Sequence, residues 1–346
     1  MLYCFMSKLN VLVCGSTGYI GIELVKILTR HKKIHIKYLC GNSSVGKNIS
    51  FYDKSLSKKK LPIIRKFQRK LLKEVDVIFS ALPNGEAQKL SKFLLDKNLL
   101  IDLSADFRLK NKNEYFKWYK IKHSAQKLIK DSIYSLPELK KNQLKNQKVI
   151  SSPGCYPTSI LLPLAPLIQK NFISNRNIVI DSKSGYSGAG RNIHKKYKNK
   201  NLYESLSAYG IANHRHNSEI QQELDLYTKK KNYFDFTPHL SPMFRGIITT
   251  INVDLKKNID AKKIHQYLSK FYKKSKFVQI KKINSLLSTN EVINTNNCLI
   301  SICNSKNKNK LIILSAIDNL IKGGGGQAVQ SMNMYYGFKE DEALNV

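Results

Sequence analysis

An apolar run, a glycine-rich turn and a helical pattern follow one another near the start of this chain. Residues 9–14 are mostly apolar, residues 15–21 read Gly-Ser-Thr-Gly-Tyr-Ile-Gly, and residues 22–28 carry apolar side chains at helical spacing. A strand, a turn and a helix in this order bring helix N-terminal amides to a strand end, where they can bind a pyrophosphate. The spacing G-x-x-G-x-x-G meets the usual dinucleotide fingerprint only in part, so a simple tight turn is the alternative. The candidate cofactor-binding residues of this turn are Gly15, Ser16, Thr17, Gly18, Tyr19, Ile20 and Gly21.

Three more strand patterns follow, at residues 34–40, 75–79 and 99–102, and each ends in turn residues. Repeated strand–turn–helix units predict a parallel sheet, whose ligands collect at the carboxyl ends of the strands. Pro83 comes just after the strand at 75–79, so we expect it to contact the cofactor.

The segment after the second strand indicates which dinucleotide is bound. An NAD site usually offers an acidic residue there to the ribose 2′-hydroxyl, whereas residues 41–47 read Gly-Asn-Ser-Ser-Val-Gly-Lys. Neutral side chains from Ser43 and Ser44, with a nearby lysine, fit a 2′-phosphate better than a free hydroxyl. The sequence therefore predicts NADP as the cofactor.

One cysteine stands among signals for the start of a helix. Cys155 lies between Pro-Gly and Tyr-Pro-Thr, directly before the apolar run at 160–168. Pro157 suits the first turn of a helix, and Gly154 allows a tight bend before it. A thiol at this position faces the positive end of a helix dipole, which favours the thiolate. A buried small hydrophobic residue is the alternative, and we predict that Cys155 is a nucleophile.

Other candidates are small residues and arginines suited to anionic ligands. Ser184 and Gly185 follow a strand pattern and let the backbone approach a cofactor closely, while Arg191 can bind a phosphate or carboxylate. The alternative for this segment is a mobile loop. Arg108 follows the strand at 99–102 and is a candidate for substrate binding, with a structural salt bridge to Asp106 as the alternative.

Two histidines flank an arginine in the second half of the chain. His214, Arg215 and His216 stand close to Glu219 at the start of a helical pattern. Histidines beside a carboxylate and an arginine suit proton transfer next to an anion. No matching cluster of cysteines or carboxylates accompanies them, so we expect no metal.

Composition excludes several classes of protein. The 346 residues suffice for two domains, and their 42% hydrophobic content suffices for real cores. No apolar stretch reaches the ~20 residues of a membrane span, and the N-terminus lacks the basic head and cleavage site of a signal peptide. Six cysteines without paired spacing indicate neither a disulfide scaffold nor a zinc site. We therefore expect a protein of the reducing cytoplasm that does not bind membranes.

The net charge of +35 raises the question of nucleic acid. Of the 59 basic residues only eight are arginines, the side chain that specific readers of bases and phosphates favour. The lysines are spread through nearly every polar segment rather than gathered in a patch. The charge can steer anionic metabolites, and we do not expect dedicated nucleic-acid binding.

The motifs together resemble the N-acetyl-gamma-glutamyl-phosphate reductases, a family of the semialdehyde dehydrogenase superfamily. The resemblance runs from Val11 nearly to the end of the chain, and several separate motifs stand in the family's order. They are GSTGYIG at 15–21, LSADFRL at 103–109, SLPEL at 135–139, SPGCYPT at 152–158, SGYSGAGR at 184–191, HRH at 214–216, PHLSPMFRGI at 238–247 and DNLIKGGGGQAVQSMN at 318–333.

The resemblance implies an α/β fold, with a Rossmann dinucleotide-binding domain plus an α+β catalytic domain of the semialdehyde dehydrogenase type. It places an NADP-binding domain at residues 1–154, completed by 315–346, and a catalytic and dimerisation domain at 155–314. It also implies NADPH-dependent reduction of N-acetyl-L-glutamyl 5-phosphate to N-acetyl-L-glutamate 5-semialdehyde, through a thioester on Cys155, in L-arginine biosynthesis. We expect a homodimer or homotetramer.

The resemblance also assigns roles to single residues. One histidine of the His-Arg-His segment would be the acid/base, for which we choose His214, leaving Arg215 and His216 to bind the substrate with Arg108 and Arg191. Gln327 would contact the cofactor. A related dehydrogenase acting on aspartate semialdehyde is the alternative, although such enzymes lack these surroundings of the cysteine and the histidines.

Overall fold

The chain divides into two compact units in a computed structural model that describes residues 8–140, 143–191, 203–228 and 230–345. The first unit comprises residues 1–152 and Gly325–Leu344, and the second comprises Pro153–Gly324 with the last two residues. The sequence placed these changes at 154/155 and 314/315. In the structure the second change comes later, because residues 310–317 form a strand of the second unit's sheet.

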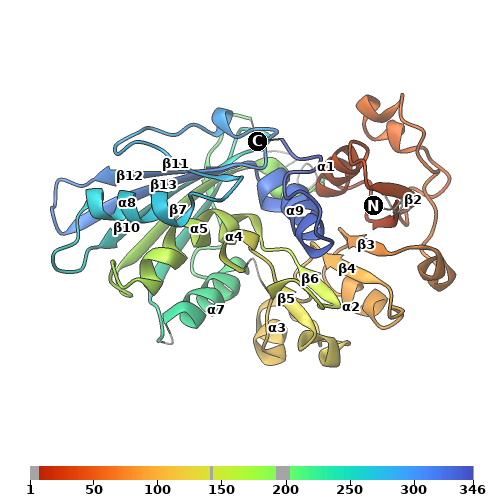
Figure 1. Cartoon of the computed structure of the whole chain (residues 1–346), viewed down its shortest axis with the longest axis horizontal. Coiled ribbons are helices and arrows are strands. Elements are labelled where there is room, and N and C mark those ends of the chain that lie inside the picture. The colour runs from red at the N-terminus through yellow and green to blue at the C-terminus, as the bar shows by residue number, and fades with distance from the viewer. Residues whose placement is uncertain (1–7, 141–142, 192–202, 229, 346) are drawn as a thin grey trace, which may run out of the picture. The chain divides into compact units, whose positions relative to one another are not determined.

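A six-stranded parallel sheet with the order β2-β1-β3-β4-β6-β5 forms the centre of the first unit (Figure 1). Its strands are β1 Leu9–Cys14, β2 Ile34–Cys40, β3 Val77–Ser80, β4 Leu99–Asp102, β5 Ser132–Tyr134 and β6 Val149–Ser151. Strands β3 and β4 are buried along their whole length, as near-continuous apolar runs in parallel sheets require. The predicted parallel sheet is confirmed. The short strands β5 and β6 were not predicted from the sequence.

The helices of the first unit are α1 Tyr19–Leu28, α2 Glu86–Ser91, α3 Lys112–Tyr119, α4 Pro137–Lys140 and α9 Gly326–Tyr335. Helix α9 comes from the far end of the sequence and packs against α1, α4 and β4. At Gly325 a Cβ would lie 3.2 Å from the backbone nitrogen of Leu24, so a small residue is needed where α9 meets α1.

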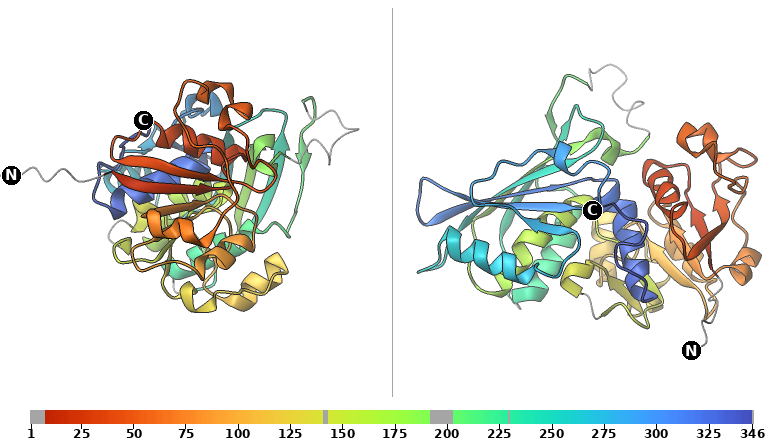
Figure 2. Two further views of the ribbon diagram at one scale, coloured as in Figure 1. Left: turned by 90° about the vertical axis from the view of Figure 1, so that its right-hand side faces the viewer. Right: turned by 45° about the horizontal axis from the view of Figure 1, so that its top comes forward.

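The second unit is built on a seven-stranded mixed sheet with the order β11-β12-β13-β10-β7-β9-β8. Its strands are β7 Ile178–Gly185, β8 Ser207–Ala208, β9 Phe234–Ser241, β10 Ile247–Asp254, β11 Val278–Ile280, β12 Cys298–Asn304 and β13 Lys310–Ile317. Helices α5 Cys155–Gln169, α7 His216–Thr228 and α8 Ala261–Phe271 lie on one face of this sheet (Figure 2). Helix α5 is buried from Tyr156 to Ile168 because it packs against α7, α8, β10 and β13.

Both parts of the predicted fold class are therefore confirmed: a Rossmann-type α/β unit and an α+β unit. None of the helices in the described residues combines the length and the apolar character needed to cross a membrane.

Candidate active site

Cys155 is the first residue of α5, as the helix-start signals predicted, and the structure shows it half-buried. The residue before it, Gly154, has extended backbone angles (φ −66°, ψ 156°) and caps the helix. The side chain of Cys155 therefore lies at a helix N-terminus, whose partial positive charge favours a thiolate and a developing oxyanion.

His216 lies directly against this turn. A Cβ placed on Gly154 would come within 2.4 Å of Nε2 of His216, so the imidazole fills the space that any larger residue at 154 would need. The ring thus lies next to the residue that precedes Cys155, at the first position of α7.

A fully buried carboxylate ties these two elements together. Oε2 of Glu219 accepts a hydrogen bond of 3.0 Å from the backbone N–H of Gly154, and Oε1 lies 3.8 Å from Nε2 of His216. Glu219 therefore fixes the distance between α7 and the start of α5, and its negative charge faces the imidazole. The sequence showed a carboxylate near the histidines but gave Glu219 no role, since its partner Gly154 is remote in the chain.

His214 has different surroundings. Its Nδ1 accepts a hydrogen bond of 3.2 Å from the backbone N–H of His216, an arrangement that requires this nitrogen to be unprotonated. Burial, together with the charge of Arg215, lowers the pKa of His214 to about 4. The ring packs edge-on against Tyr156, Tyr209 and Phe236, with centroids 5.4–5.7 Å apart. At neutral pH this histidine is held neutral in an aromatic enclosure.

The predicted substrate arginines fall in different places. Arg215 and Arg191 are exposed in the second unit, and Arg191 stands two residues after the short turn Tyr186–Ala189. Arg108 belongs to the first unit and is buried, with hydrogen bonds from its guanidinium to the carbonyls of Ser152 (2.8 Å) and Leu103 (2.9 Å).

Asp106, the alternative partner of Arg108, is buried and accepts hydrogen bonds from the amides of Gly85 and Gln88 and from the Tyr115 hydroxyl. Its carboxylate therefore anchors the start of α2.

The glycine-rich turn lies at the carboxyl end of β1, as predicted. Gly15 has φ +76°, and a Cβ there would lie 2.3 Å from the carbonyl oxygen of Ala81, so only glycine fits. Gly18 is the N-cap of α1 and has extended backbone angles, so the positive end of this helix begins within the glycine-rich turn.

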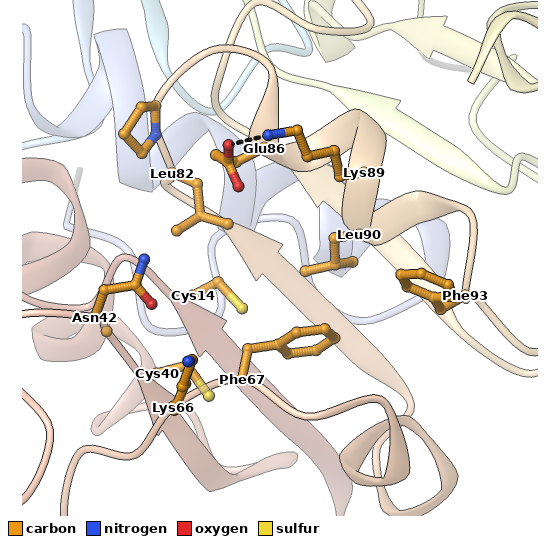
Figure 3. Close-up of a pocket in the computed structure, with 12 residues that line it drawn as sticks. Cys14, Cys40, Asn42, Lys66, Phe67, Leu82, Glu86, Lys89, Leu90 and Phe93 are labelled. Carbon is orange, nitrogen blue, oxygen red and sulfur yellow. Dashed lines mark hydrogen bonds and ion pairs between the residues drawn. The ribbon is translucent and has the colours of Figure 1, made fainter. Parts of the chain in front are cut away.

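A cavity of about 450 Å³ opens in the first unit at the carboxyl ends of β1, β2 and β3 (Figure 3). Its walls combine apolar side chains such as Phe67, Leu82 and Leu90 with Pro83, which was predicted to contact a cofactor. Apolar walls of this kind suit a flat aromatic ring. Ser43 is exposed near the end of β2, and Ser44 is buried there.

Lys66 also lines this cavity and was not predicted. The chain returns past the end of β2 through a bridge between Cys40 and Arg65, which brings two cations to the segment that lacks an acidic residue. No local sequence pattern predicts that residues 65 and 66 lie beside the end of β2, because residues 65 and 40 meet only in the folded sheet.

The remaining predicted cofactor residues divide between the units. Gln327 is buried in the first turn of α9, and among the described residues neither of its side-chain amide atoms has a hydrogen-bond partner. Ser184 and Gly185 end β7 in the second unit. The tight glycine turn, the apolar cavity, the cations and the unpartnered Gln327 amide together fit a phosphorylated dinucleotide.

Two family models match most of the chain. Residues 10–147 match the NAD binding domain of semialdehyde dehydrogenase, and residues 155–319 match its dimerisation domain.

Curated proteins called N-acetyl-gamma-glutamyl-phosphate reductase are similar over nearly the full length. The protein of Desulforamulus reducens is 40% identical, over 97% of this chain and 98% of its own. That of Brachyspira hyodysenteriae is 42% identical with the same coverage, and that of Vesicomyosocius okutanii is 43% identical, also with 97% and 98% covered.

Solved structures share the fold at low sequence identity. Aspartate semialdehyde dehydrogenase II from Vibrio cholerae superposes with a TM-score of 0.70 at 15% identity, covering 96% of this chain and 99% of that one. Aspartate semialdehyde dehydrogenase from Candida albicans, solved with NADP, gives a TM-score of 0.66 at 14% identity, with 95% and 98% covered.

Proposed function

The chain belongs to the N-acetyl-gamma-glutamyl-phosphate reductases of the semialdehyde dehydrogenase family, and from this premise we propose the reaction that it catalyses. It reduces N-acetyl-L-glutamyl 5-phosphate with NADPH to N-acetyl-L-glutamate 5-semialdehyde and phosphate, a step of L-arginine biosynthesis. The observation that carries the proposal is the group of Cys155, His216 and Glu219 at the meeting point of α5 and α7.

Cys155 acts first. Its thiolate attacks the acyl carbon, a C–S bond forms, and phosphate leaves with the electron pair of the broken C–O bond. The amides at the start of α5 stabilise the oxyanion that develops on the acyl oxygen. A thioester results, which accepts hydride better than a carboxylate does.

Bound NADPH supplies the hydride that reduces this thioester. The tetrahedral oxyanion then collapses and the C–S bond breaks. The aldehyde leaves, and Cys155 recovers its thiolate. A neighbouring imidazole that can hold a proton stabilises the thiolate and protonates it between turnovers.

We assign this proton to His216, whereas the sequence alone favoured His214. Contact with Gly154 and the carboxylate of Glu219 support His216, because a negative neighbour favours the imidazolium form. His214 accepts a hydrogen bond through Nδ1 and has a pKa of about 4, which suits a neutral positioning residue.

The phosphate and the single free carboxylate of the substrate are anions, which cationic side chains can bind. Arg191 and Arg215 are exposed in the unit that carries Cys155, which supports a role in binding those groups. Arg108 is proposed for the same role, although its hydrogen bonds to backbone carbonyls also support a structural one.

NADP is the proposed cofactor, bound by the residues of the turn at 15–21, by Ser43, Ser44 and Pro83, and by Ser184, Gly185 and Gln327. Two observations support the phosphorylated dinucleotide: Lys66 lines the cavity, and residues 41–47 contain no acidic side chain. A match to a dimerisation domain supports a homodimer or homotetramer. Five cysteines without disulfides among the described residues support a cytoplasmic location.

The experiment follows the reaction in reverse. Purified protein is given NADP⁺, phosphate and either N-acetyl-L-glutamate 5-semialdehyde or L-aspartate 4-semialdehyde, and absorbance of NADPH is recorded. Phosphate-dependent reduction of NADP⁺ with the acetylated substrate supports the proposal. Preference for the aspartate compound would assign the chain to the alternative activity.

A further inference from the structure

Two cysteines that the proposed reaction does not use lie side by side at the ends of neighbouring strands. Cys14 ends β1 and Cys40 ends β2, and the two residues are register partners in the parallel ladder. A one-residue shift between Val11 and Leu12 brings them into register. Both side chains are buried in the same apolar cluster, so they point to the same face of the sheet.

The spacing of the two cysteines allows a covalent link. Neighbouring strands of a sheet lie about 4.8 Å apart, within the ~4.4–6.8 Å that Cα atoms joined by a disulfide span. Within the described part of the first unit no other cysteine competes, because Cys155, Cys298 and Cys303 belong to the second unit.

A small oxidant can reach the pair. Both cysteines are almost fully buried, but both line the cavity of about 450 Å³ beside Phe67 (Figure 3). Contact with the Cys14 side chain lowers the pKa of Cys40, and the charge of Arg65 acts in the same direction. Contact with Cys40 and burial raise the pKa of Cys14. Cys40 is thus the attacking thiolate and Cys14 the resolving thiol.

We propose that Cys14 and Cys40 form a reversible disulfide under peroxide, and that this bond switches off dinucleotide binding. The Cys40 thiolate attacks one oxygen of hydrogen peroxide, the O–O bond breaks, and a sulfenic acid forms with release of hydroxide, which takes up a proton as water. Cys14 loses its proton and attacks the Cys40 sulfur, an S–S bond forms, and the S–O bond breaks to release a second water. Two thiols are oxidised and one peroxide is reduced to two waters.

The disulfide acts on the glycine-rich turn through the backbone of Cys40. Its carbonyl accepts hydrogen bonds from the amides of Gly15 (2.9 Å) and Ser16 (3.3 Å). A disulfide brings Cβ atoms to about 3.8 Å, closer than unlinked neighbours on adjacent strands. Gly15 cannot follow freely, because its Cα already faces the Ala81 carbonyl without room for a Cβ. This effect rests on the proposed cofactor site.

The test uses the full chain with Cys155→Ser, so that oxidation of the nucleophile does not contribute. Protein is treated with hydrogen peroxide, digested without reduction, and searched by mass spectrometry for a peptide pair linked through Cys14 and Cys40. Affinity for NADP⁺ is measured by calorimetry on the same samples. We expect the linked peptides, a Kd raised at least about tenfold, and recovery after treatment with dithiothreitol.

Further cysteine substitutions in this background separate the pair from other oxidation. Cys40→Ala and, independently, Cys14→Ala should bind NADP⁺ equally well before and after peroxide. Cys298→Ala removes a buried cysteine of β12 and should stay sensitive to peroxide.

Normal NADP⁺ binding with unlinked cysteines after peroxide would overturn the switch, as would a linked protein with unchanged affinity. Untreated protein that binds no NADP⁺ would contradict the proposed cofactor and the switch together.

Discussion

The backbone N–H of Gly154 donates a hydrogen bond of 3.0 Å to the buried carboxylate of Glu219. Gly154 directly precedes Cys155, and Glu219 lies one helical turn beyond His216. A single carboxylate therefore positions the turn that carries the thiol and the helix that carries the imidazole.

Replacing the thiol tests the nucleophile. Cys155→Ser should reduce turnover by several orders of magnitude, because a serine hydroxyl has no thiolate-like form near neutral pH. NADPH binding and the thermal midpoint should stay close to those of the unsubstituted protein. Cys303→Ser, a partly buried cysteine of β12, is the matched control and should keep full activity. More than about a tenth of normal turnover in Cys155→Ser would remove this residue from the role.

The two histidines can be separated by kinetics. His216→Asn should lower kcat by about 10²–10⁴-fold, the usual contribution of a positioned acid/base. His214→Asn should have the milder effect, because a histidine with a pKa of about 4 is neutral throughout the working range. The reverse order, with His214→Asn inactive and His216→Asn nearly normal, would restore the assignment made from sequence.

Charge removal at Glu219 should act through His216. Glu219→Gln keeps an oxygen that can accept from Gly154 but loses the negative charge near the imidazole. We expect a fall in kcat of roughly 10–100-fold and a shift of the histidine limb of the pH–rate profile to lower pH. Glu223→Gln, one turn further along α7 and also buried, is the control. An unshifted profile with reduced stability would indicate a structural role instead.

Cofactor choice should respond to a single charge at the end of β2. Asn42 lines the cavity, and Asn42→Asp places there the acidic residue that NAD sites use. The Kd for NADPH should rise at least about tenfold relative to that for NADH, which calorimetry with both nucleotides measures. Asn48→Asp introduces the same charge outside the cavity lining, at the cap of a short turn, and should leave the ratio unchanged. Equal affinities in the unsubstituted protein would contradict the proposed preference.

Asp102 should make the folded state less stable as pH rises. Burial, and then the charge of Asp106, raises the pKa of Asp102 to about 7, above the value of about 4 expected when unfolded. The folded carboxyl stays protonated where the unfolded one has ionised, so stability is full below about pH 4 and declines up to about pH 7.

Urea unfolding at about pH 5 and about pH 8 checks this decline, which should be on the order of a few kcal/mol. Asp102→Asn should flatten it, whereas Asp96→Asn, an exposed carboxylate, should not. An equal decline in both variants would place the titrating group elsewhere.

The sequence by itself determined the local geometry of the fold and of the nucleophile. Apolar runs that end in glycine predicted the strands and the turn at 15–21. The left-handed backbone at position 15 favours glycine, and buried parallel strands are apolar along their length, so neighbouring residues alone reveal both features. Pro157 and Gly154 predicted the helix start at Cys155, since helix capping depends on neighbouring residues.

Tertiary structure alone decided what depends on partners remote in the chain. The Glu219 carboxylate meets Gly154 across 65 residues, and Lys66 reaches the end of β2 only through the bridge at Arg65. The different environments of His214 and His216 arise in the same way, because burial and hydrogen-bond partners, not spacing along the chain, set the protonation of an imidazole. The register that pairs Cys14 with Cys40 likewise depends on a one-residue shift between two strands, which neither strand's sequence specifies.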